Sequence, residues 1–399
     1  MRLSSKLARV APATTIALNE RAMAMRRAGQ DVVNFTVGEP DFPTPEHVRQ
    51  AGIQAIETGH TKYTPAAGTE DLKEAICRKL LRDQGLQYER SQIVVSSGGK
   101  NSIYNLLFVT CEDGDEVLVP APYWVSYTEM VKLVGAEPVV LPTTAETTFK
   151  ITPDQLKAAI TPRTKLLMLN SPCNPTGTVY SRAELEGLAA VIADAGIFVI
   201  SDELYEKILY DGATHHSLAA FNARMYDLTL VVNGLSKAYA MTGWRLGYAA
   251  GPRPIMAGAS KFQGQTVNHP SSITQYAGVA ALNGPEDFIQ QMVHEFHRRR
   301  DAIVERLNRM DGVSCVRPEG AFYVFPDVSA YTGRRTPAGQ RITGSLDLSM
   351  YLLEERKVAT VPGIAFGAEG FIRISYATSM EVIVRGLDRI EEGLAQLHE

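Results

Sequence analysis

Residues 233–252 read Asn-Gly-Leu-Ser-Lys-Ala-Tyr-Ala-Met-Thr-Gly-Trp-Arg-Leu-Gly-Tyr-Ala-Ala-Gly-Pro, and they follow the apolar run Leu230–Val232. The apolar run predicts a buried strand, and binding sites in open α/β sheets gather just beyond the carboxyl ends of strands. Lys237 is therefore expected at a ligand site. Its small and apolar neighbours would partly desolvate the amine, which disfavours the charged form and yields a nucleophile that can condense with an aldehyde. A lone loop lysine, by contrast, usually extends to water.

Outward from this segment, short β-rich runs alternate with helical patterns from about residue 91 onward. This alternation predicts βαβ units and a mostly parallel sheet with helices on both faces. The expected strands are Ile93–Ser96, Glu116–Val119, Pro138–Leu141, Lys165–Leu169, Phe198–Ser201 and Thr229–Val232. The expected helices between them include Tyr123–Val134, Pro153–Ile160 and Ala183–Ala195.

The pattern changes near residue 286. A long polar helix is expected over Glu286–Met310, followed later by a loop over Tyr331–Gly344, a helix over Leu346–Arg356 and a terminal helix. Further strand-like runs are Val313–Val316, Ala321–Phe325, Val358–Val361 and Phe371–Ser375. A chain of 399 residues fits two domains. We predict an α/β fold with a large domain over residues 46–285 and a smaller α+β domain over residues 286–399. Residues 1–45 are expected to form an arm and a helix that join the small domain.

Composition and charge narrow the class of protein. Forty basic against forty-four acidic side chains give a formal charge of −4, whereas a nucleic-acid-binding protein usually shows a basic excess. No run approaches the roughly 18 apolar residues that span a bilayer, and the N-terminus lacks the apolar core of a signal peptide. The four cysteines form no CxxC pair, so neither a zinc nor a redox motif is expected, and no metal. These features favour a cytoplasmic enzyme that binds neither nucleic acid nor membrane.

Two further segments place polar side chains after predicted strands. Ser171–Thr178 contains two prolines and a glycine that fix a turn and present Asn174. Ser201–Glu206 brings Asp202 and Tyr205 to the same edge of the sheet. Amide and hydroxyl groups can donate to a phenolate oxygen, while a carboxylate suits a protonated pyridine nitrogen. Taken alone, Asn174 could form a hydrogen bond with the backbone of its own turn, and Asp202 could be the N-cap of a helix.

Residues suited to an anion or a flat ring lie in other segments. Gly98 and Gly99 let backbone N–H groups approach an anion at a helix N-terminus, although the Walker spacing GxxxxGK[ST] is absent. Arg245 could clamp a phosphate or form a surface salt bridge. Trp124 could stack on an aromatic cofactor or pack in the core. Arg373, in the strand-like Phe-Ile-Arg-Ile-Ser, needs a buried anion to justify its position.

Nine segments in order resemble those of the class I aminotransferases of fold type I, in particular their prokaryotic aspartate aminotransferase branch. The segments are VNFTVGEPDFPTPEHV, TKYTPAAGTEDLKEAI, SSGGKNSIYN, APYWVSYTEMV, LNSPCNPTGTVYS, ISDELYEKILYDG, VNGLSKAYAMTGWRLGYAAGP, GAFYVFPDVSA and GFIRISYATS. Any one could arise by chance, but the ordered set runs through nearly the whole chain. The resemblance implies the fold-type-I architecture, pyridoxal 5′-phosphate as cofactor, and transamination between an amino acid and a 2-oxo acid.

The resemblance also implies roles for single residues. Lys237 is similar to the lysine that carries the cofactor and shuttles the substrate proton. The implied cofactor ligands are Asp202 at the ring nitrogen, Asn174 and Tyr205 at the ring oxygen, Trp124 against the ring, and Gly98, Gly99, Arg245 and Ser236 at the phosphate. Gly38 and Arg373, with Trp124 and Asn174 nearby, are similar to the residues that hold the substrate α-carboxylate. Tyr63 is similar to a tyrosine that reaches the phosphate from the neighbouring subunit, which implies a homodimer.

The implied substrates are dicarboxylates. Lys100 resembles a lysine that binds the distal carboxylate, and Thr15 resembles a nearby recognition residue. We therefore expect aspartate and 2-oxoglutarate to give oxaloacetate and glutamate; the same pocket in this branch sometimes converts prephenate to arogenate. Two features depart from the pattern: Ala11 stands where many relatives carry a basic residue, and Gln263–Pro270 differs from the usual serine/threonine-rich form. His269 in that segment could bind a carboxylate or pack.

Three alternative functions remain open at this point. The chain could be an aminotransferase for aromatic or neutral amino acids, or it could catalyse another fold-type-I reaction such as β-elimination. It could also be a regulatory protein with an aminotransferase-like domain. A regulator would carry an additional DNA-binding segment, whereas the resemblance here begins almost at the first residue.

Overall fold

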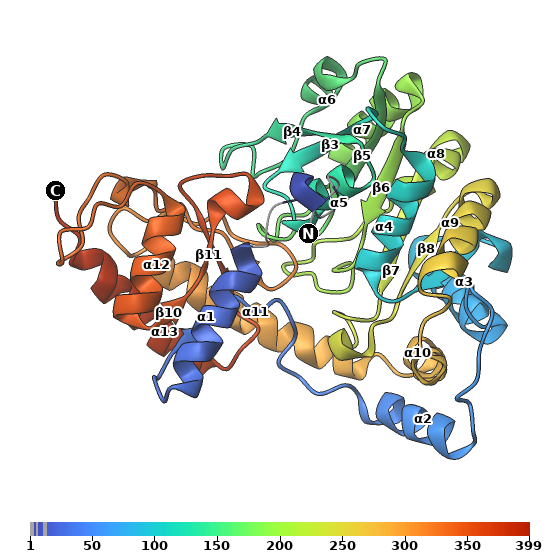
Figure 1. Ribbon diagram of the computed structural model, residues 1–399, viewed down its shortest axis with the longest axis horizontal. Coiled ribbons are helices and arrows are strands. Elements are labelled where there is room, and N and C mark those ends of the chain that lie inside the picture. Colours follow the sequence, from blue (N-terminus) through green and yellow to red (C-terminus); the bar gives the residue numbers. More distant parts are fainter. Residues whose placement is uncertain (1–3, 5–6, 11–13) are drawn as a thin grey trace.

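The computed structural model describes residues 4, 7–10 and 14–399, and for residues 14–17 it describes only the backbone. Its largest element is a seven-stranded sheet in the order β2-β8-β7-β6-β5-β3-β4 (Figure 1). The strands are β2 (Ile93–Ser96), β3 (Glu116–Ala121), β4 (Glu137–Pro142), β5 (Thr164–Asn170), β6 (Phe198–Asp202), β7 (Thr229–Gly234) and β8 (Gly247–Ala250). β8 is antiparallel to both of its neighbours, and the other pairs are parallel. The predicted mostly parallel sheet is confirmed.

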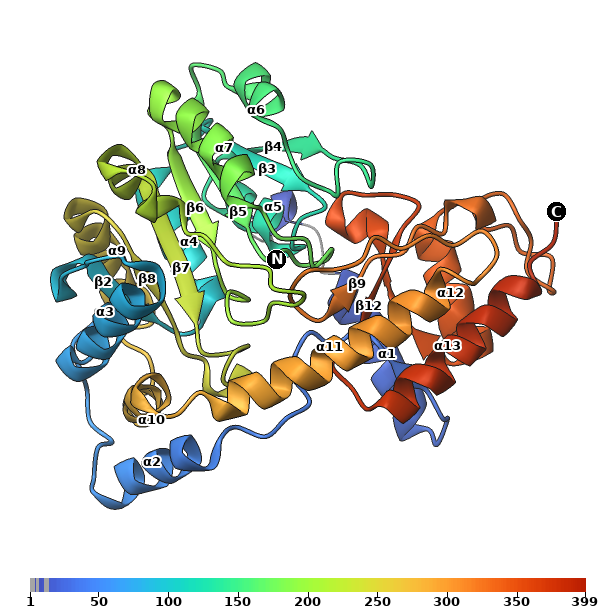
Figure 2. The same cartoon turned by 180° about the vertical axis from the view of Figure 1, so that it is seen from behind.

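Helices cover both faces of this sheet (Figures 1 and 2). Along β5, Leu166 and Met168 pack on one side, whereas Leu167 and Leu169 pack on the other, because successive side chains of a strand point to opposite faces. The helices on the first face are α4 (Gly99–Thr110), α5 (Ser126–Leu133) and α9 (Arg253–Thr266). Those on the second are α3 (Glu70–Gln84), α6 (Pro153–Ala159), α7 (Arg182–Ala195), α8 (Ala223–Leu228) and α10 (Ser272–Asn283). α2 (Glu46–Glu57) packs on α10.

Local signals fix where these helices begin and end. α7 starts with a capping box, in which the side chains of Ser181 and Glu184 bond each other's backbone N–H groups. It ends at Gly196, whose φ of 67° is the left-handed conformation that glycine adopts without strain. α6 starts in the same way, with a Thr152–Gln155 capping box and Pro153 at the first helical position.

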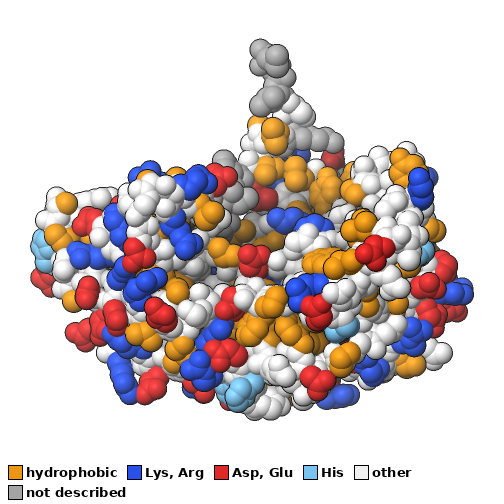
Figure 3. Space-filling model, turned by 90° about the horizontal axis from the view of Figure 1, so that it is seen from below, with side chains coloured by type: hydrophobic (Ala, Val, Ile, Leu, Met, Phe, Trp, Pro, Cys, Tyr) orange, Lys and Arg blue, Asp and Glu red, His pale blue; other side chains and the backbone are white. Residues whose placement is uncertain are grey.

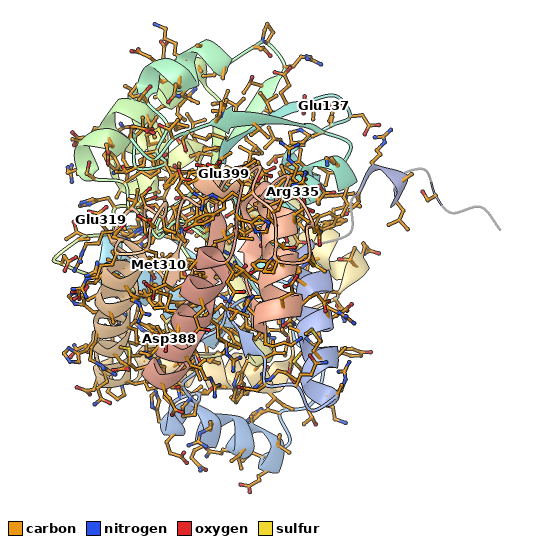
Figure 4. All side chains as sticks on the ribbon, turned by 90° about the vertical axis from the view of Figure 1, so that its left-hand side faces the viewer. Glu137, Met310, Glu319, Arg335, Asp388 and Glu399 are labelled. Atoms are coloured by element: carbon orange, nitrogen blue, oxygen red, sulfur yellow. The ribbon has the colours of Figure 1, made fainter. Side chains whose placement is uncertain are left out.

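A second hydrophobic core lies in the C-terminal part of the chain, around α11 (Asp287–Leu307), α12 (Ser345–Arg356) and α13 (Met380–Ala395). These helices pack with a small antiparallel sheet of β11 (Val361–Pro362), β12 (Ile372–Ser375) and β9 (Tyr323–Val324). Figure 2 shows α11 running from beside α10, near the large sheet, into the C-terminal part, where α13 lies alongside it. The C-terminal end packs on this part of the chain, since Arg335 and His398 exchange backbone hydrogen bonds. Figure 4 labels Arg335 and the last residue, Glu399.

The N-terminal segment packs on this second core. β1 (Val33–Asn34) pairs in parallel with β10 (Val358–Ala359), and α1 (Thr14–Arg27) packs Leu18, Ala22 and Met25 against Leu353. The domain boundaries at residues 45 and 285 stay a prediction. Short 3₁₀ helices cover Leu7–Arg9, Arg90–Gln92, Leu218–Ala220, Thr242–Trp244, Ser329–Tyr331 and Gly363–Phe366. In the described part of the chain, no helix is long and apolar enough to cross a membrane.

Two expected elements need correction, and one strand was not predicted. The strand expected over Val313–Val316 is wrong: the side chain of Asn308 bonds both the N–H and the C=O of Cys315, replacing the partners that a strand would need. The helix expected from Tyr123 begins only at Ser126. The Tyr123 N–H bonds the carbonyl of Phe366, so a contact with the C-terminal part sets the path of the chain ahead of the helix. β8 was not predicted, because Gly-Tyr-Ala-Ala lacks the β-branched residues that mark strands.

Candidate active site

A cavity of about 470 Å³ opens at the carboxyl ends of β5, β6 and β7, where the sheet meets the C-terminal part. Most of the residues singled out from the sequence line it, although they come from segments far apart in the chain. They are Gly38, Gly99, Lys100, Trp124, Asn174, Asp202, Tyr205, Ser236, Lys237, Arg245 and Arg373. The expectation that sites gather at these strand ends is therefore met for this group.

Lys237 follows β7 by three residues and extends into the cavity. Its Nζ donates to the carbonyl oxygen of Gly38 at 2.5 Å, and no carboxylate of the described residues lies within ion-pair distance. Burial, reinforced by the positive charge of Arg373, lowers the pKa of Lys237 to about 8. A sizeable fraction of the amine is therefore neutral, and so nucleophilic, near neutral pH.

Asp202 is the last residue of β6, and its carboxyl group is almost completely buried. Oδ1 accepts the backbone N–H of Leu204 at 3.2 Å, and Oδ2 accepts the hydroxyl of Tyr127 at 2.5 Å. Burial raises the pKa of Asp202 to about 6, against the opposing effect of the Tyr127 hydrogen bond. The helix cap considered from the sequence is excluded, since a turn and not a helix follows Asp202.

One end of the cavity is built for an anion. Gly98, with a φ of 89°, precedes the first turn of α4, whose N–H groups have no partners within the helix. The guanidinium of Arg245 would lie 2.6 Å from a Cβ at Gly98, and the positive φ of this residue is a conformation that favours glycine. A Cβ at Gly247 of β8 would collide with the backbone of Gly99. Arg245 bonds the carbonyl of Thr242 and forms no ion pair with a described carboxylate.

A second cationic group is Arg373, on β12. Its guanidinium is buried, donating to Asn174 Oδ1 at 3.0 Å and to the carbonyl of Thr36 at 2.6 Å, while Nε has no partner among the described atoms. Burial lowers the pKa of Arg373. A buried guanidinium without a carboxylate is costly unless a ligand supplies the anion. The anion that the sequence predicts next to this strand stays a prediction.

Lys100 adds a third cation, from the first turn of α4. Its Nζ lies 4.9 Å from the centre of the Trp124 ring, and it forms no ion pair with a described carboxylate. Burial, and then the charge of Arg245, lower the pKa of Lys100.

Other predicted residues lie elsewhere. The ring of Tyr63 is 88% exposed and does not line the cavity; its edge packs against His269 at 5.6 Å between ring centres. His269 also accepts the Thr64 N–H, and Gln263 bonds the carbonyls of Ala66 and Val95. This segment therefore packs within its own chain. The side chain of Thr15, and Ala11 altogether, lie outside the described residues.

Sequence reasoning missed several side chains of the site, of which Tyr127 and Tyr323 are the most important. The hydroxyl of Tyr323 bonds that of Tyr205 at 2.8 Å, and it would lie only 2.5 Å from a Cβ added to Gly38. Its ring centre is 4.6 Å from the guanidinium carbon of Arg373. No spacing rule marks either tyrosine, because a buried tyrosine is equally at home in a hydrophobic core.

One group of described residues has the donor set of a metal site: Glu203, Glu206 and His215, whose ligand atoms lie within 4.8 Å of one another. Lys79, however, forms a buried ion pair with Glu206, and the Gln84 amide donates to both carboxylates. Ser201 and Ser217 donate to the remaining oxygen of Glu203. Because the lysine already supplies the positive charge, this cluster is a buried ion-pair network.

Comparison with known proteins agrees with this geometry. The family model described as "Aminotransferase class I and II" matches residues 30–390. The chain is 47% identical over 396 residues to the aspartate/prephenate aminotransferase of Cereibacter sphaeroides, covering 99% of each chain. It is 44% identical over 393 residues to the aspartate aminotransferase of Geobacillus stearothermophilus, covering 98% of each. The crystal structure of the aspartate aminotransferase from Rhizobium meliloti matches all of both chains with a TM-score of 0.96 at 44% identity.

These similarities extend over the whole fold and confirm the predicted fold-type-I architecture. Together with a nucleophilic lysine, a buried acid and an anion cradle at one edge of the sheet, they confirm the resemblance found in the sequence. The chain belongs to the class I and II aminotransferases, enzymes that use pyridoxal phosphate to transfer amino groups between amino acids and 2-oxo acids.

Proposed function

We propose that this aminotransferase acts on dicarboxylates, converting aspartate and 2-oxoglutarate to oxaloacetate and glutamate, with prephenate as a further substrate. The observation that carries the proposal is that three cationic side chains, Lys100, Arg245 and Arg373, face one cavity without carboxylate partners among the described residues. One phosphate and two substrate carboxylates would match these three charges. The names of the Geobacillus and Cereibacter relatives agree with this substrate class.

The residues fit pyridoxal phosphate. Arg245 and the N-terminus of α4, with Ser236 beside them, would hold the phosphate, and the face of Trp124 would cover the ring. Asp202 would keep the ring nitrogen protonated, since this carboxyl has no cationic partner within ion-pair distance among the described residues. The side chains of Asn174 and Tyr205 would donate to the ring oxygen. When bound, the cofactor supplies the electron sink that stabilises charge left on the substrate α-carbon.

Lys237 would hold the cofactor covalently and later move the substrate proton. Its amine is neutral often enough to accept a proton from the α-carbon, and its position beside Gly38 places it near the carboxylate clamp of Arg373. Arg373 would orient the α-carboxylate as a two-pronged donor. Lys100, on the same wall as Trp124, would bind the distal carboxylate and so select aspartate over alanine.

The pKa of Lys237 gives a pH dependence for cofactor uptake by the cofactor-free protein. Only the neutral amine attacks an aldehyde, and with a pKa of about 8 roughly one tenth of it is neutral at pH 7. The uptake rate should rise about tenfold per pH unit below pH 8 and level off above it. Stopped-flow quenching of tryptophan fluorescence would record the profile. A midpoint near the ordinary lysine value of 10.5 would contradict the assigned environment.

The Lys100→Ala variant tests the substrate class. We expect kcat/KM for aspartate to fall about 100-fold, because a charge-assisted contact in a partly desolvated site is lost, while alanine changes less than threefold. Single-turnover reactions of the cofactor-loaded enzyme with aspartate, glutamate, alanine, phenylalanine and arogenate would measure both effects. Equal losses for aspartate and alanine would remove Lys100 from this role. A chain that reacts faster with phenylalanine or alanine than with either dicarboxylate would instead support an aromatic or neutral aminotransferase.

The same experiment separates transamination from β-elimination. A transaminase converts its cofactor to the amine form once and then waits for an oxo acid, whereas a lyase releases ammonia and continues to turn over. Spectra recorded without an added oxo acid therefore distinguish the two reactions.

We also propose that two chains form a homodimer with shared sites. Ile53 and Ile56 of α2 are exposed, and so is Tyr63. The rings of Phe108 and Phe262 stack on each other, and this pair is partly exposed. Figure 3 views the molecule from below Figure 1, the side on which α2 lies, and shows hydrophobic side chains gathered between charged ones. Solitary exposed apolar residues are normal, but patches mark contact surfaces. A second copy would bury this surface and bring Tyr63 to the phosphate end of its partner's cavity.

Sedimentation equilibrium should give twice the chain mass of 43.6 kDa. In Tyr63→Phe, which keeps the ring but removes the hydroxyl, cofactor affinity should fall about tenfold while the dimer persists. A monomeric wild-type protein with unimpaired cofactor binding would contradict the shared site.

We also propose that the enzyme acts in the cytoplasm. Its four cysteines are free, as is usual for proteins of that reducing compartment.

A further inference from the structure

Tyr127 touches two of the groups that would contact the cofactor ring. Its hydroxyl donates to Asp202 Oδ2 at 2.5 Å, and its ring meets that of Trp124 edge-on, at 5.5 Å between centres and 89° between planes. The side chain is 2% exposed and lies on α5, one turn after Trp124. A single buried residue therefore connects the ring that would cover the cofactor with the acid at its nitrogen.

The Tyr127 hydroxyl is a fixed donor. Burial, followed by the adjacent charge of Asp202, raises the pKa of Tyr127 well above its usual value, so the tyrosine keeps its proton near neutral pH. Core packing alone would require only the ring. A tyrosine hydroxyl placed on a buried carboxylate forms a charge-assisted hydrogen bond, which is about twice as strong as a neutral one.

The hydrogen bonds to Asp202 hold its carboxyl group from two sides. The Leu204 N–H binds Oδ1 and the Tyr127 hydroxyl binds Oδ2. A carboxylate offers about four acceptor positions, so positions remain for one more donor from the cavity that Asp202 lines. The two bonds fix the plane of the carboxyl group, and both favour its charged form over the neutral one.

We propose that Tyr127 is a positioning residue that keeps Asp202 ionised and correctly oriented for the ring nitrogen of the cofactor. The proposal rests on the proposed role of Asp202. Without the Tyr127 hydroxyl, Asp202 loses a hydrogen bond that favours its charged form, and its burial then makes the carboxyl group a stronger base. The proton between Asp202 and the ring nitrogen would then move from the nitrogen to Asp202. A cofactor with a neutral nitrogen is a weaker electron sink, which slows removal of the substrate proton.

The test compares Tyr127→Phe with Tyr351→Phe. Tyr351 is also a buried tyrosine whose hydroxyl bonds one acceptor, the carbonyl of Gly393, but it lies in the C-terminal core. Both variants keep their rings. The ring nitrogen of ¹⁵N-labelled cofactor, followed by NMR, reports its protonation directly, and equilibrium dialysis gives the cofactor dissociation constant.

We expect Tyr127→Phe to move the ¹⁵N resonance toward the neutral form, to weaken cofactor binding at least about tenfold, and to lower kcat for aspartate more than it changes KM. Tyr351→Phe should leave all three as in the wild type. Since Tyr127 acts through Asp202, adding Tyr127→Phe to an Asp202→Asn background should change cofactor affinity less than threefold.

Two outcomes would overturn the proposal, and they differ in meaning. If Asp202→Asn shifts the ¹⁵N resonance but Tyr127→Phe does not, or if Tyr127→Phe costs the same in both backgrounds, then Tyr127 is a packing residue and the role of Asp202 stands. If Asp202→Asn itself leaves the resonance unchanged, the proposed function of Asp202 fails, and the role of Tyr127 fails with it.

Discussion

Lys237→Ala loses transamination almost completely: we expect the rate of the aspartate half-reaction to fall by about 10⁴-fold or more. The variant removes both the covalent attachment of the cofactor and the base that takes the substrate proton, and general acid–base catalysis alone is worth about 10²- to 10⁴-fold. Among the described residues that line the cavity, the other amine is that of Lys100, which lies over Trp124 at the start of α4 and is not expected to replace it. Single-turnover absorbance changes after mixing with aspartate would measure the loss.

Lys100→Ala is the matched control for this prediction. It removes the other lysine of the same cavity, and we expect it to retain near-normal turnover of alanine. If Lys237→Ala stays within tenfold of the wild type for any amino acid, another group moves the proton and the assignment of Lys237 is wrong.

Arg373→Lys should lower kcat/KM about 1,000-fold, and by the same factor for aspartate and alanine. Both substrates carry the α-carboxylate, and a lysine keeps the charge but lacks the planar fork that binds a carboxylate through two parallel bonds. The substitution also breaks the hydrogen bonds to Asn174 and to the carbonyl of Thr36, which position these groups around the site. Leaving a buried charge without its partner costs about 3–5 kcal/mol, which is consistent with a loss of about 1,000-fold in kcat/KM.

The contrast with Lys100→Ala makes the assignment specific, because Lys100→Ala should discriminate between the two amino acids and Arg373→Lys should not. Arg299→Lys controls for the loss of a buried guanidinium, since Arg299 is paired with Asp41 and Glu295 outside the cavity. We expect it to stay within threefold of the wild type. A selective loss of aspartate activity in Arg373→Lys would show that Arg373 binds the distal carboxylate instead.

Most of the sheet could be predicted from the sequence because its inner strands are buried on both faces, whereas the edge strand β4 is largely exposed. β5 and β7 are nearly continuous apolar runs, and the helices before and after β5 begin with clear caps at Thr152 and Ser181. β8 could not be predicted because one of its residues must be small in order to form the site. Its Gly247 must be small so that the backbone of Gly99 can approach, and small residues carry little strand signal.

The site could be predicted wherever a residue follows a strand or lies in a distinctive motif, as with Lys237, Asp202 and Arg373. It could not be predicted where the role depends on contact between distant segments. Tyr127 reaches Asp202 across 75 positions of sequence, and Tyr323 reaches Tyr205 across 118. Neither partner leaves a periodic signal, because each hydrogen bond is made by one side chain and fixed by the packing of whole elements.

The attachment of the cofactor to one lysine is tested most directly by reduction with borohydride. The protein is incubated with pyridoxal phosphate, reduced, digested and analysed by mass spectrometry. We predict a yellow protein whose added mass lies on the peptide containing Lys237 and is absent from Lys237→Ala. A colourless protein without added mass at residue 237, or one modified at Lys100 instead, would contradict the proposed chemistry of the site.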